Sequence, residues 1–179
     1  MLNIATPYGE ISVINEPAYS FGSADNVRTY PFAKCLMPGA RPISVHGLLL
    51  NDKPLAAFGA TGGATGIHEH SALWLNGHLL LAICDSVVSV KLHPFELCWA
   101  LRVDDATCFG LHLHQQSGCL LSHGELSMTR FTEAGAIVWQ SGGYDIFTGS
   151  LVFNDEFISI KDFNGYEHRL GYIDGKLFA

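Results

Sequence analysis

The sequence predicts an all-β domain built from short antiparallel sheets that repeat along the chain, like the blades of a β-propeller. Its apolar segments are short and are punctuated by turns, with 19 glycines among 179 residues. No stretch of eleven or more residues places its apolar positions with the 3.6-residue period of a helix. We therefore expect a small or partial propeller-like array of about 3.5–4 antiparallel blades. An irregular β-sandwich or barrel is the alternative architecture.

A short landmark recurs four times along the chain. It has the form aliphatic-serine-aliphatic, and its serines are Ser44, Ser89, Ser127 and Ser159. These serines lie 45, 38 and 32 residues apart. A large residue follows each serine after ten to fourteen positions, at Phe58, Trp99, Trp139 and Arg169. The repeating unit is therefore about 40 residues long, which is the length that the four strands of one blade require.

The residues before the landmarks predict the first strand of each unit, at 71–75, 110–114 and 149–153. The middle unit is the clearest. Its strands are predicted at 110–114, 118–122, 125–131 and 136–140, with polar turns between them. Strands are also predicted at 10–15 and 30–36, although these do not align with the unit. We expect one domain over residues 1–179, with unaligned N-terminal strands in 1–42 and blade-like repeats in 43–179.

The segment from Thr132 to Trp139, TEAGAIVW, resembles the tryptophan-docking repeat of pyrroloquinoline-quinone-type propellers. In that family a glycine four residues before a tryptophan turns the chain into an outer strand, and the tryptophan packs against a neighbouring blade. Segment 162–169 is similar but lacks the tryptophan, while segment 94–99 keeps Trp99 and lacks the glycine. The resemblance implies blades that are docked by Trp99 and Trp139. It does not imply the quinone cofactor, because those enzymes need more blades and a calcium-carboxylate site.

The composition bears on partners. Apolar residues make up 48% of the chain and charged residues only 15%, which favours self-association as well as buried strands. Because about four blades make a very small propeller and an open array exposes strand edges, we expect a homodimer whose two chains complete one ring. The net charge of −7 and the absence of a basic cluster exclude a nucleic-acid partner. The longest apolar stretch is too short to span a bilayer, so no membrane partner is expected.

Cysteine usage bears on localisation. The five cysteines are odd in number, contain no CxxC pair and are mostly in apolar runs, as expected for free thiols in a reducing compartment. The first ten residues lack the basic start and apolar run of a signal peptide. We therefore expect a cytoplasmic protein.

The glycine-rich stretch 59–66, which we interpret as a crossover between two blades, leads into His68-Glu69-His70. Side chains two apart on a strand share a face, so His68 and His70 could chelate one metal ion. A second pair, His112 and His114, occupies the corresponding strand of the next unit. If those strands are neighbours, four imidazoles could converge. The structural alternative is that these histidines cap strands or face solvent near turns.

Acidic residues recur between the units, at Glu69, at Asp104-Asp105 and at Asp145. A structural interpretation is that such carboxylates accept hydrogen bonds from turn amides and lock adjacent blades. A functional interpretation is that Glu69, Asp105 and Asp145 line one mouth of the ring together with His68 and His70. That arrangement could bind a cation or a polar ligand.

These observations favour a non-enzymatic binding or protein-interaction scaffold, acting through its loops or through a protein partner. Propellers commonly serve as platforms, although this argument is an analogy at the level of the fold. The alternative is a metal-binding protein or metal-dependent enzyme that uses the His68-x-His70 strand. We expect no cofactor, with a transition metal at these histidines as the one exception considered.

Overall fold

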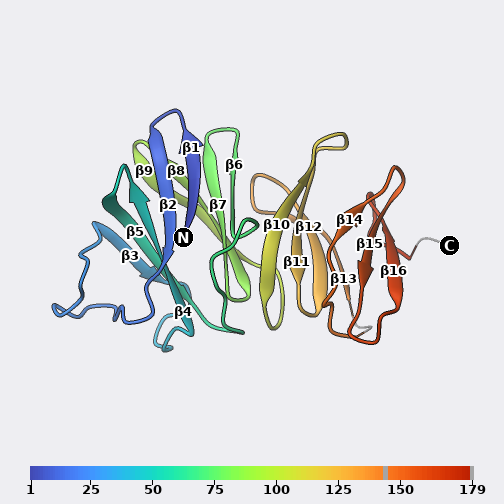
Figure 1. Cartoon of the computed structure of the whole chain (residues 1–179), viewed down its shortest axis with the longest axis horizontal. Helices are drawn as coiled ribbons and strands as arrows, with labels where there is room; N and C mark the ends of the chain where they lie inside the picture. The colour runs from blue at the N-terminus through green and yellow to red at the C-terminus, as the bar shows by residue number, and fades with distance from the viewer. Residues whose placement is uncertain (143–144, 178–179) are drawn as a thin grey trace.

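The computed structural model describes residues 1–142 and 145–177, and these residues form sixteen strands and no helix. The strands make four sheets that follow one another along the chain (Figure 1). The sheets stand side by side from the N-terminal to the C-terminal end of the molecule (Figure 1). The prediction of an all-β, propeller-like array of about four antiparallel blades is confirmed.

The first sheet has five strands in the order β1-β2-β4-β5-β3. They are β1 (Leu2–Thr6), β2 (Gly9–Asn15), β3 (Phe32–Cys35), β4 (Ser44–Leu50) and β5 (Lys53–Ala60). Only β3 runs parallel to its neighbour, β5, and it adds an outermost strand to an otherwise antiparallel sheet. Residues 1–42, which did not align with the repeat, therefore supply three strands of the first blade.

The other sheets keep the order of the chain. The second contains β6 (Ala72–Leu75), β7 (His78–Ile83), β8 (Ser86–Leu92) and β9 (Phe95–Arg102). The third contains β10 (Cys108–His114), β11 (Cys119–Gly124), β12 (Ser127–Phe131) and β13 (Ile137–Gly142). The fourth contains β14 (Val152–Phe153), β15 (Phe157–Lys161) and β16 (Glu167–Gly171), with Leu177 bridging back to Leu170.

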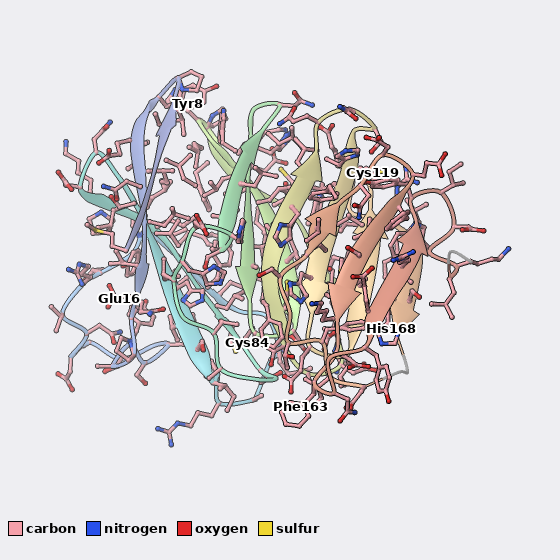
Figure 2. The ribbon with its side chains drawn as sticks, turned by 45° about the vertical axis from the view of Figure 1, so that its right-hand side comes forward. Tyr8, Glu16, Cys84, Cys119, Phe163 and His168 are labelled. Atoms are coloured by element: carbon pink, nitrogen blue, oxygen red, sulfur yellow. The ribbon has the colours of Figure 1, made fainter. Side chains whose placement is uncertain are left out.

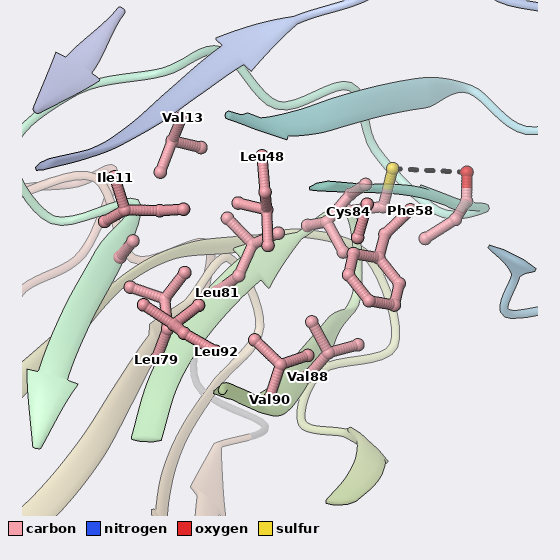
Figure 3. Packing of buried hydrophobic residues seen from close by; sticks show 14 residues of the cluster. Ile11, Val13, Leu48, Phe58, Leu79, Leu81, Cys84, Val88, Val90 and Leu92 are labelled. Atoms are coloured by element: carbon pink, nitrogen blue, oxygen red, sulfur yellow. Dashed lines mark hydrogen bonds between the residues drawn. The ribbon is translucent and has the colours of Figure 1, made fainter. Parts of the chain in front are cut away.

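The core lies between the sheets and explains the apolar composition. Strand β7 shows the principle: Leu79 and Leu81 pack with Leu48 and Phe58 of the first sheet (Figure 3), whereas Leu80 packs toward the third sheet. A strand that is covered on both faces must be apolar at successive positions, because its side chains alternate between the faces. The high apolar content is thus accounted for by packing inside one chain and gives no separate support to self-association.

Two tryptophans connect consecutive sheets. Trp99 of β9 packs its indole on Gly135 and donates a hydrogen bond from Nε1 to the Glu133 carbonyl at 2.9 Å. Trp139 of β13 packs on Gly175 and donates to the Tyr172 carbonyl at 3.0 Å. Both glycines have positive φ, and a Cβ atom at either would lie within 3 Å of the indole. Each tryptophan therefore docks the outer strand of one sheet on a glycine turn of the next.

The fourth copy of the repeat was misaligned. Three landmark serines, Ser44, Ser89 and Ser127, lie in the third strand of their sheets, but Ser159 lies in β15, the second strand of the fourth sheet. Arg169 correspondingly lies in β16, the third strand of its sheet, whereas Phe58, Trp99 and Trp139 lie in the fourth strands of theirs. The reason is that adjacent strands of a sheet that is buried on one face carry the same alternating pattern, so a tripeptide cannot distinguish them.

The far face of the first sheet is covered by the chain itself. The segment between β2 and β3 folds back so that Tyr19, Phe21 and Tyr30 pack together against Val45 of this sheet. The Tyr30 hydroxyl donates to the buried Glu16 carboxylate at 2.6 Å. The first and fourth sheets lie at opposite ends of the array (Figure 1), so the described blades do not close into a four-bladed ring.

Candidate functional site

One end of the array collects the connections into β6, β10 and β14, and we call it the mouth end. Because neighbouring strands are antiparallel, the β7–β8, β11–β12 and β15–β16 turns lie at this end too. Figure 2 shows Cys84 and Phe163, from the first and last of these turns, at the same lower end, with Tyr8 and Cys119 at the opposite end. The mouth end is therefore built from all four sheets.

A pocket of about 590 Å³ opens at the mouth end. The crossover from β5 to β6, the strands β10 and β11, and the connection into β14 all contribute to it. Its lining residues are Ala64, Thr65, Gly66, His68, His70, Phe109, His112, His123, Thr148, Gly149, Ser150 and Leu151. Segments of three sheets thus meet around one cavity, which is the kind of place where ligand sites commonly form.

The crossover is held in place by a small polar network. The Thr65 amide donates to Ser44 Oγ at 2.9 Å, and Thr65 Oγ1 lies 3.0 Å from His46 Nε2 and accepts from the Cys84 amide at 3.1 Å. His46 is fully buried. Glycine at position 110 leaves room for the crossover on β10, because a Cβ atom there would lie 2.6 Å from His70 Cβ. The crossover can therefore lie flat against β10.

Four imidazoles gather in the pocket. The ring centroids of His70 and His112 are 4.4 Å apart, those of His112 and His123 are 6.1 Å apart, and those of His68 and His70 are 6.2 Å apart. His68 and His70 were expected on one strand, but both precede β6 and lie in the crossover. They do not project from a strand as a parallel pair, since His68 Nδ1 accepts a hydrogen bond from the His70 amide at 3.2 Å.

The two deeper histidines are held uncharged. Burial lowers the pKa of His112 to about 3, and the neighbouring His70 adds to the effect. Burial lowers the pKa of His123 to about 4. Near pH 7 both rings are therefore neutral, with one N–H donor and one nitrogen acceptor each. Among residues 1–142 and 145–177, His123 Nε2 has no hydrogen-bond partner, although it is buried.

The second histidine pair is divided by the fold. His112 lines the pocket, but His114 does not. The ring of His114 stacks nearly parallel to the rings of Phe153 and Tyr172, with centroid distances of 4.9 and 4.8 Å, and its Nδ1 lies 2.7 Å from Ser117 Oγ. Four imidazoles do meet, as the sequence analysis considered, but the fourth is His123. Antiparallel pairing places His123 opposite Gly110, on the same face of the sheet as His112.

The three predicted acids surround the pocket without lining it. Glu69 is highly exposed and its carboxylate lies 3.6 Å from His70 Nε2. Asp105 is also exposed and forms an ion pair with Arg102 at 3.3 Å. Asp145 accepts hydrogen bonds from its neighbouring amide and from the Asn164 side chain. Each acid belongs to a different connection, into β6, β10 and β14 respectively.

The expected metal site has no cluster of ligands in the described residues. Over residues 1–142 and 145–177, no three His, Cys, Asp or Glu side chains are placed to hold a metal ion together. The rings of His70 and His112 lie 4.4 Å apart and are tilted by 36° to each other. The five cysteines are free thiols, of which Cys84, Cys108 and Cys119 are buried.

Asp104 is the acid that locks adjacent turns, as one interpretation of the recurring carboxylates proposed. Its Oδ1 accepts from the amides of Ala106 and Thr107, at 2.6 and 3.0 Å. Its Oδ2 accepts from the amides of Leu126 and Ser127, at 3.0 and 2.8 Å. The carboxylate therefore ties the β9–β10 connection to the β11–β12 turn. Burial raises the pKa of Asp104, while these four amides act to lower it.

Replacing Asp104 with asparagine should destabilise the protein by about 2–4 kcal/mol, because a side-chain NH2 would then face two buried backbone donors. The matched control is Asp105→Asn, whose side chain is 83% exposed and should change stability by less than about 0.5 kcal/mol. Urea denaturation of the two variants measures the difference. Equal stabilities would contradict the assigned role of Asp104.

Comparison with known proteins supports the architecture alone. No protein-family model and no curated protein matches this chain. Among solved structures, the crystal structure of BamB from Moraxella catarrhalis, a β-propeller protein, is similar with a TM-score of 0.54 and 15% identity. The match covers 83% of this chain and 49% of BamB, so the chain spans about half the length of that protein.

The class that fold and comparison define is an array of propeller-type blades. The likeness to BamB agrees with the blade architecture that the tryptophan-docking resemblance implied. At 15% identity it establishes the fold and not a function. The described part of the chain also contains no helix long and apolar enough to cross a membrane.

Proposed function

We propose that this protein is a non-enzymatic binding scaffold of the propeller type that holds a protein partner at its mouth end. The observation that carries this proposal is that the pocket and a set of exposed apolar side chains share that end. The exposed side chains are Ile43, Phe109, Leu126, Ile146, Phe163 and Tyr166. Phe163 and Tyr166 are 72% and 70% exposed. Exposed apolar groups beside a pocket are typical of interaction surfaces.

The opposite end of the sheets differs in character. Its turns are mostly polar and include Asn51-Asp52, Asn76-Gly77 and the segment 115–118. Tyr8 and Ile173 are the large exposed apolar residues of its described turns. This contrast supports the mouth end as the binding surface. The likeness to BamB adds an analogy at the level of the fold, since propeller folds commonly act as platforms for other proteins.

The proposal is tested by affinity capture, followed by binding measurements with the purified captured protein. We expect Phe163→Ser combined with Tyr166→Ser to weaken binding by about tenfold or more, because exposed aromatics are frequent anchors of interfaces. Ile173→Ser, an 83% exposed residue at the opposite end, is the matched control and should bind like the wild type. Equal binding by all three proteins, or loss only in the Ile173 variant, would contradict the proposal.

The second candidate function is transition-metal binding by His68 and His70. The gathering of four imidazoles around one pocket favours it, since imidazole is a common ligand of transition metals. Elemental analysis of the purified protein distinguishes the two candidates. A stoichiometric transition metal that disappears on combining His68→Ala with His70→Ala would support metal binding. Metal-free protein of normal stability would exclude it.

A further inference from the structure

The chemistry of the pocket wall restricts what can enter it. The lining combines Phe109 and Leu151 with the faces of His70, His112 and His123, and contains no Lys or Arg. A buried anion would lack a cation to pair with, so carboxylates and phosphates are poor occupants. Aromatic and imidazole faces suit a flat apolar group instead. The wall therefore fits an aromatic side chain better than a charged metabolite.

One polar atom adds a second requirement. His123 is 91% buried, and its Nε2 has no hydrogen-bond partner in the part of the chain that the structure describes. A buried polar atom without a partner is costly, and a ligand that satisfies it regains that cost on binding. The indole N–H of tryptophan or the hydroxyl of tyrosine can supply such a bond while the rest of the ring stays among apolar groups. This favours tryptophan or tyrosine over phenylalanine or leucine as the inserted side chain.

The surroundings of the pocket add charge. One carboxylate stands on each of three connections at the mouth end, namely Glu69, Asp105 and Asp145, and the connections that carry Glu69 and Asp145 also line the pocket. The cations at this end include Arg41 and Lys161, together with Arg28, which is paired with Glu16, and Arg102, which is paired with Asp85 and Asp105. The chain as a whole has a net charge of −7. The rim of the pocket is therefore suited to a positively charged partner.

We propose that the mouth end binds a basic peptide segment of its partner, with a tryptophan or tyrosine side chain inserted in the histidine pocket. Lysine or arginine residues on either side of this anchor pair with Glu69, Asp105 and Asp145. This inference rests on the proposed scaffold function and specifies the partner's chemistry. It also gives a role to the three acids that do not line the pocket.

The test uses the full chain and four labelled peptides in fluorescence anisotropy: KKAWAKK, the serine form KKASAKK, the leucine form KKALAKK and the acidic form EEAWAEE. We expect KKAWAKK to bind, the serine and acidic forms to bind about tenfold or more weakly, and the leucine form to fall between them. Rising salt should weaken binding of KKAWAKK, because the rim contacts are between exposed charges.

Variants test the charged rim and the contact of His123 with the aromatic anchor separately. Combining Glu69→Gln, Asp105→Asn and Asp145→Asn should abolish the preference for KKAWAKK over EEAWAEE. The matched control combines Asp155→Asn, Glu156→Gln and Asp174→Asn at the opposite end and should keep that preference. His123→Phe should remove the advantage of tryptophan over leucine, because the unsatisfied nitrogen is gone. Thermal unfolding of each variant confirms that it is folded.

Three outcomes would overturn the inference: no binding of any peptide, equal binding of the basic and acidic forms, or equal effects of the two triple variants. The scaffold proposal fails on different grounds. If the peptides do not bind while captured protein still depends on Phe163 and Tyr166, the scaffold stands and the basic aromatic segment is wrong. If that dependence is also absent, both proposals fail.

Discussion

Lowering the pH from 7 to 5 is expected to remove several kcal/mol from the free energy of unfolding, because three buried histidines are uncharged in the fold. Burial lowers the pKa of His46 to about 4, of His112 to about 3 and of His123 to about 4. In the unfolded chain each would titrate near 6.5. Between these values the unfolded state binds more protons, so stability is complete above about pH 6.5 and falls as the pH drops toward the folded pKa values.

The size of the effect follows from linkage. Each histidine contributes a loss of about 1.4 kcal/mol per pH unit below 6.5, or about 2 kcal/mol at pH 5. His46→Gln isolates one contribution, since glutamine cannot take up a proton at the buried site. The variant is expected to be less stable at pH 7, yet its loss between pH 7 and pH 5 should be smaller by about 2 kcal/mol.

Urea denaturation at the two pH values measures these differences. His78→Gln is the matched control for the substitution itself, because His78 is only partly buried and lies at the start of β7. Equal stability of the wild type at pH 7 and pH 5 would show that the three histidines are solvated in solution.

Trp139→Ala is expected to cost about 3–5 kcal/mol and to loosen the fourth sheet selectively. Trp139 is 8% exposed and lies in the cluster that joins the third and fourth sheets. Its removal leaves a cavity over Gly175 and takes away one of the two hydrogen bonds that the Tyr172 carbonyl accepts, the other coming from Arg130. Strands β14 to β16 depend on this contact surface, so their amides should exchange with solvent faster than those of the second sheet.

Two controls separate docking from general loss of packing. Trp139→Phe keeps a ring over Gly175 but loses the hydrogen bond from Nε1, and an intermediate cost is expected. Val138→Ala changes the neighbouring residue, which is 46% exposed, and should alter stability by less than about 0.5 kcal/mol. Urea denaturation and amide exchange measure both effects. Uniform acceleration of exchange across all four sheets would contradict a docking role.

The elements that are defined by residues close together in the chain could be predicted from the sequence. Alternating apolar residues between polar turns predicted strands at 110–114, 118–122, 125–131 and 136–140, and these overlap β10 to β13. Trp99 and Trp139 were identified as docking residues from the resemblance to the tryptophan-docking repeat, although only Trp139 has the glycine four residues before it, and both contact glycine turns of the next sheet. Such features depend on residues close in the chain, so the sequence alone contains them.

The elements that depend on packing between sheets could not be predicted from the sequence. Strand β1 (Leu2–Thr6) was missed, because a five-residue edge strand carries too little pattern to be recognised. The fourth repeat was displaced by one strand because β15 and β16 carry similar alternation. Its docking glycine is Gly175, which contacts Trp139, and not Gly165. Which of two similar strands is outermost is decided by the sheet with which it packs.

The all-β blade array therefore followed from the sequence itself, because alternation, turns and docking tryptophans act over short separations. The candidate site depended on the tertiary structure. His70, His112 and His123 meet only because the crossover lies flat on Gly110 and β10 pairs with β11 in one register. The packing of the sheets also separates His114 from these three rings and leaves the three acids outside the lining of the pocket. Which side chains share a pocket depends on how the sheets pack, and the spacing of residues along one chain does not record it.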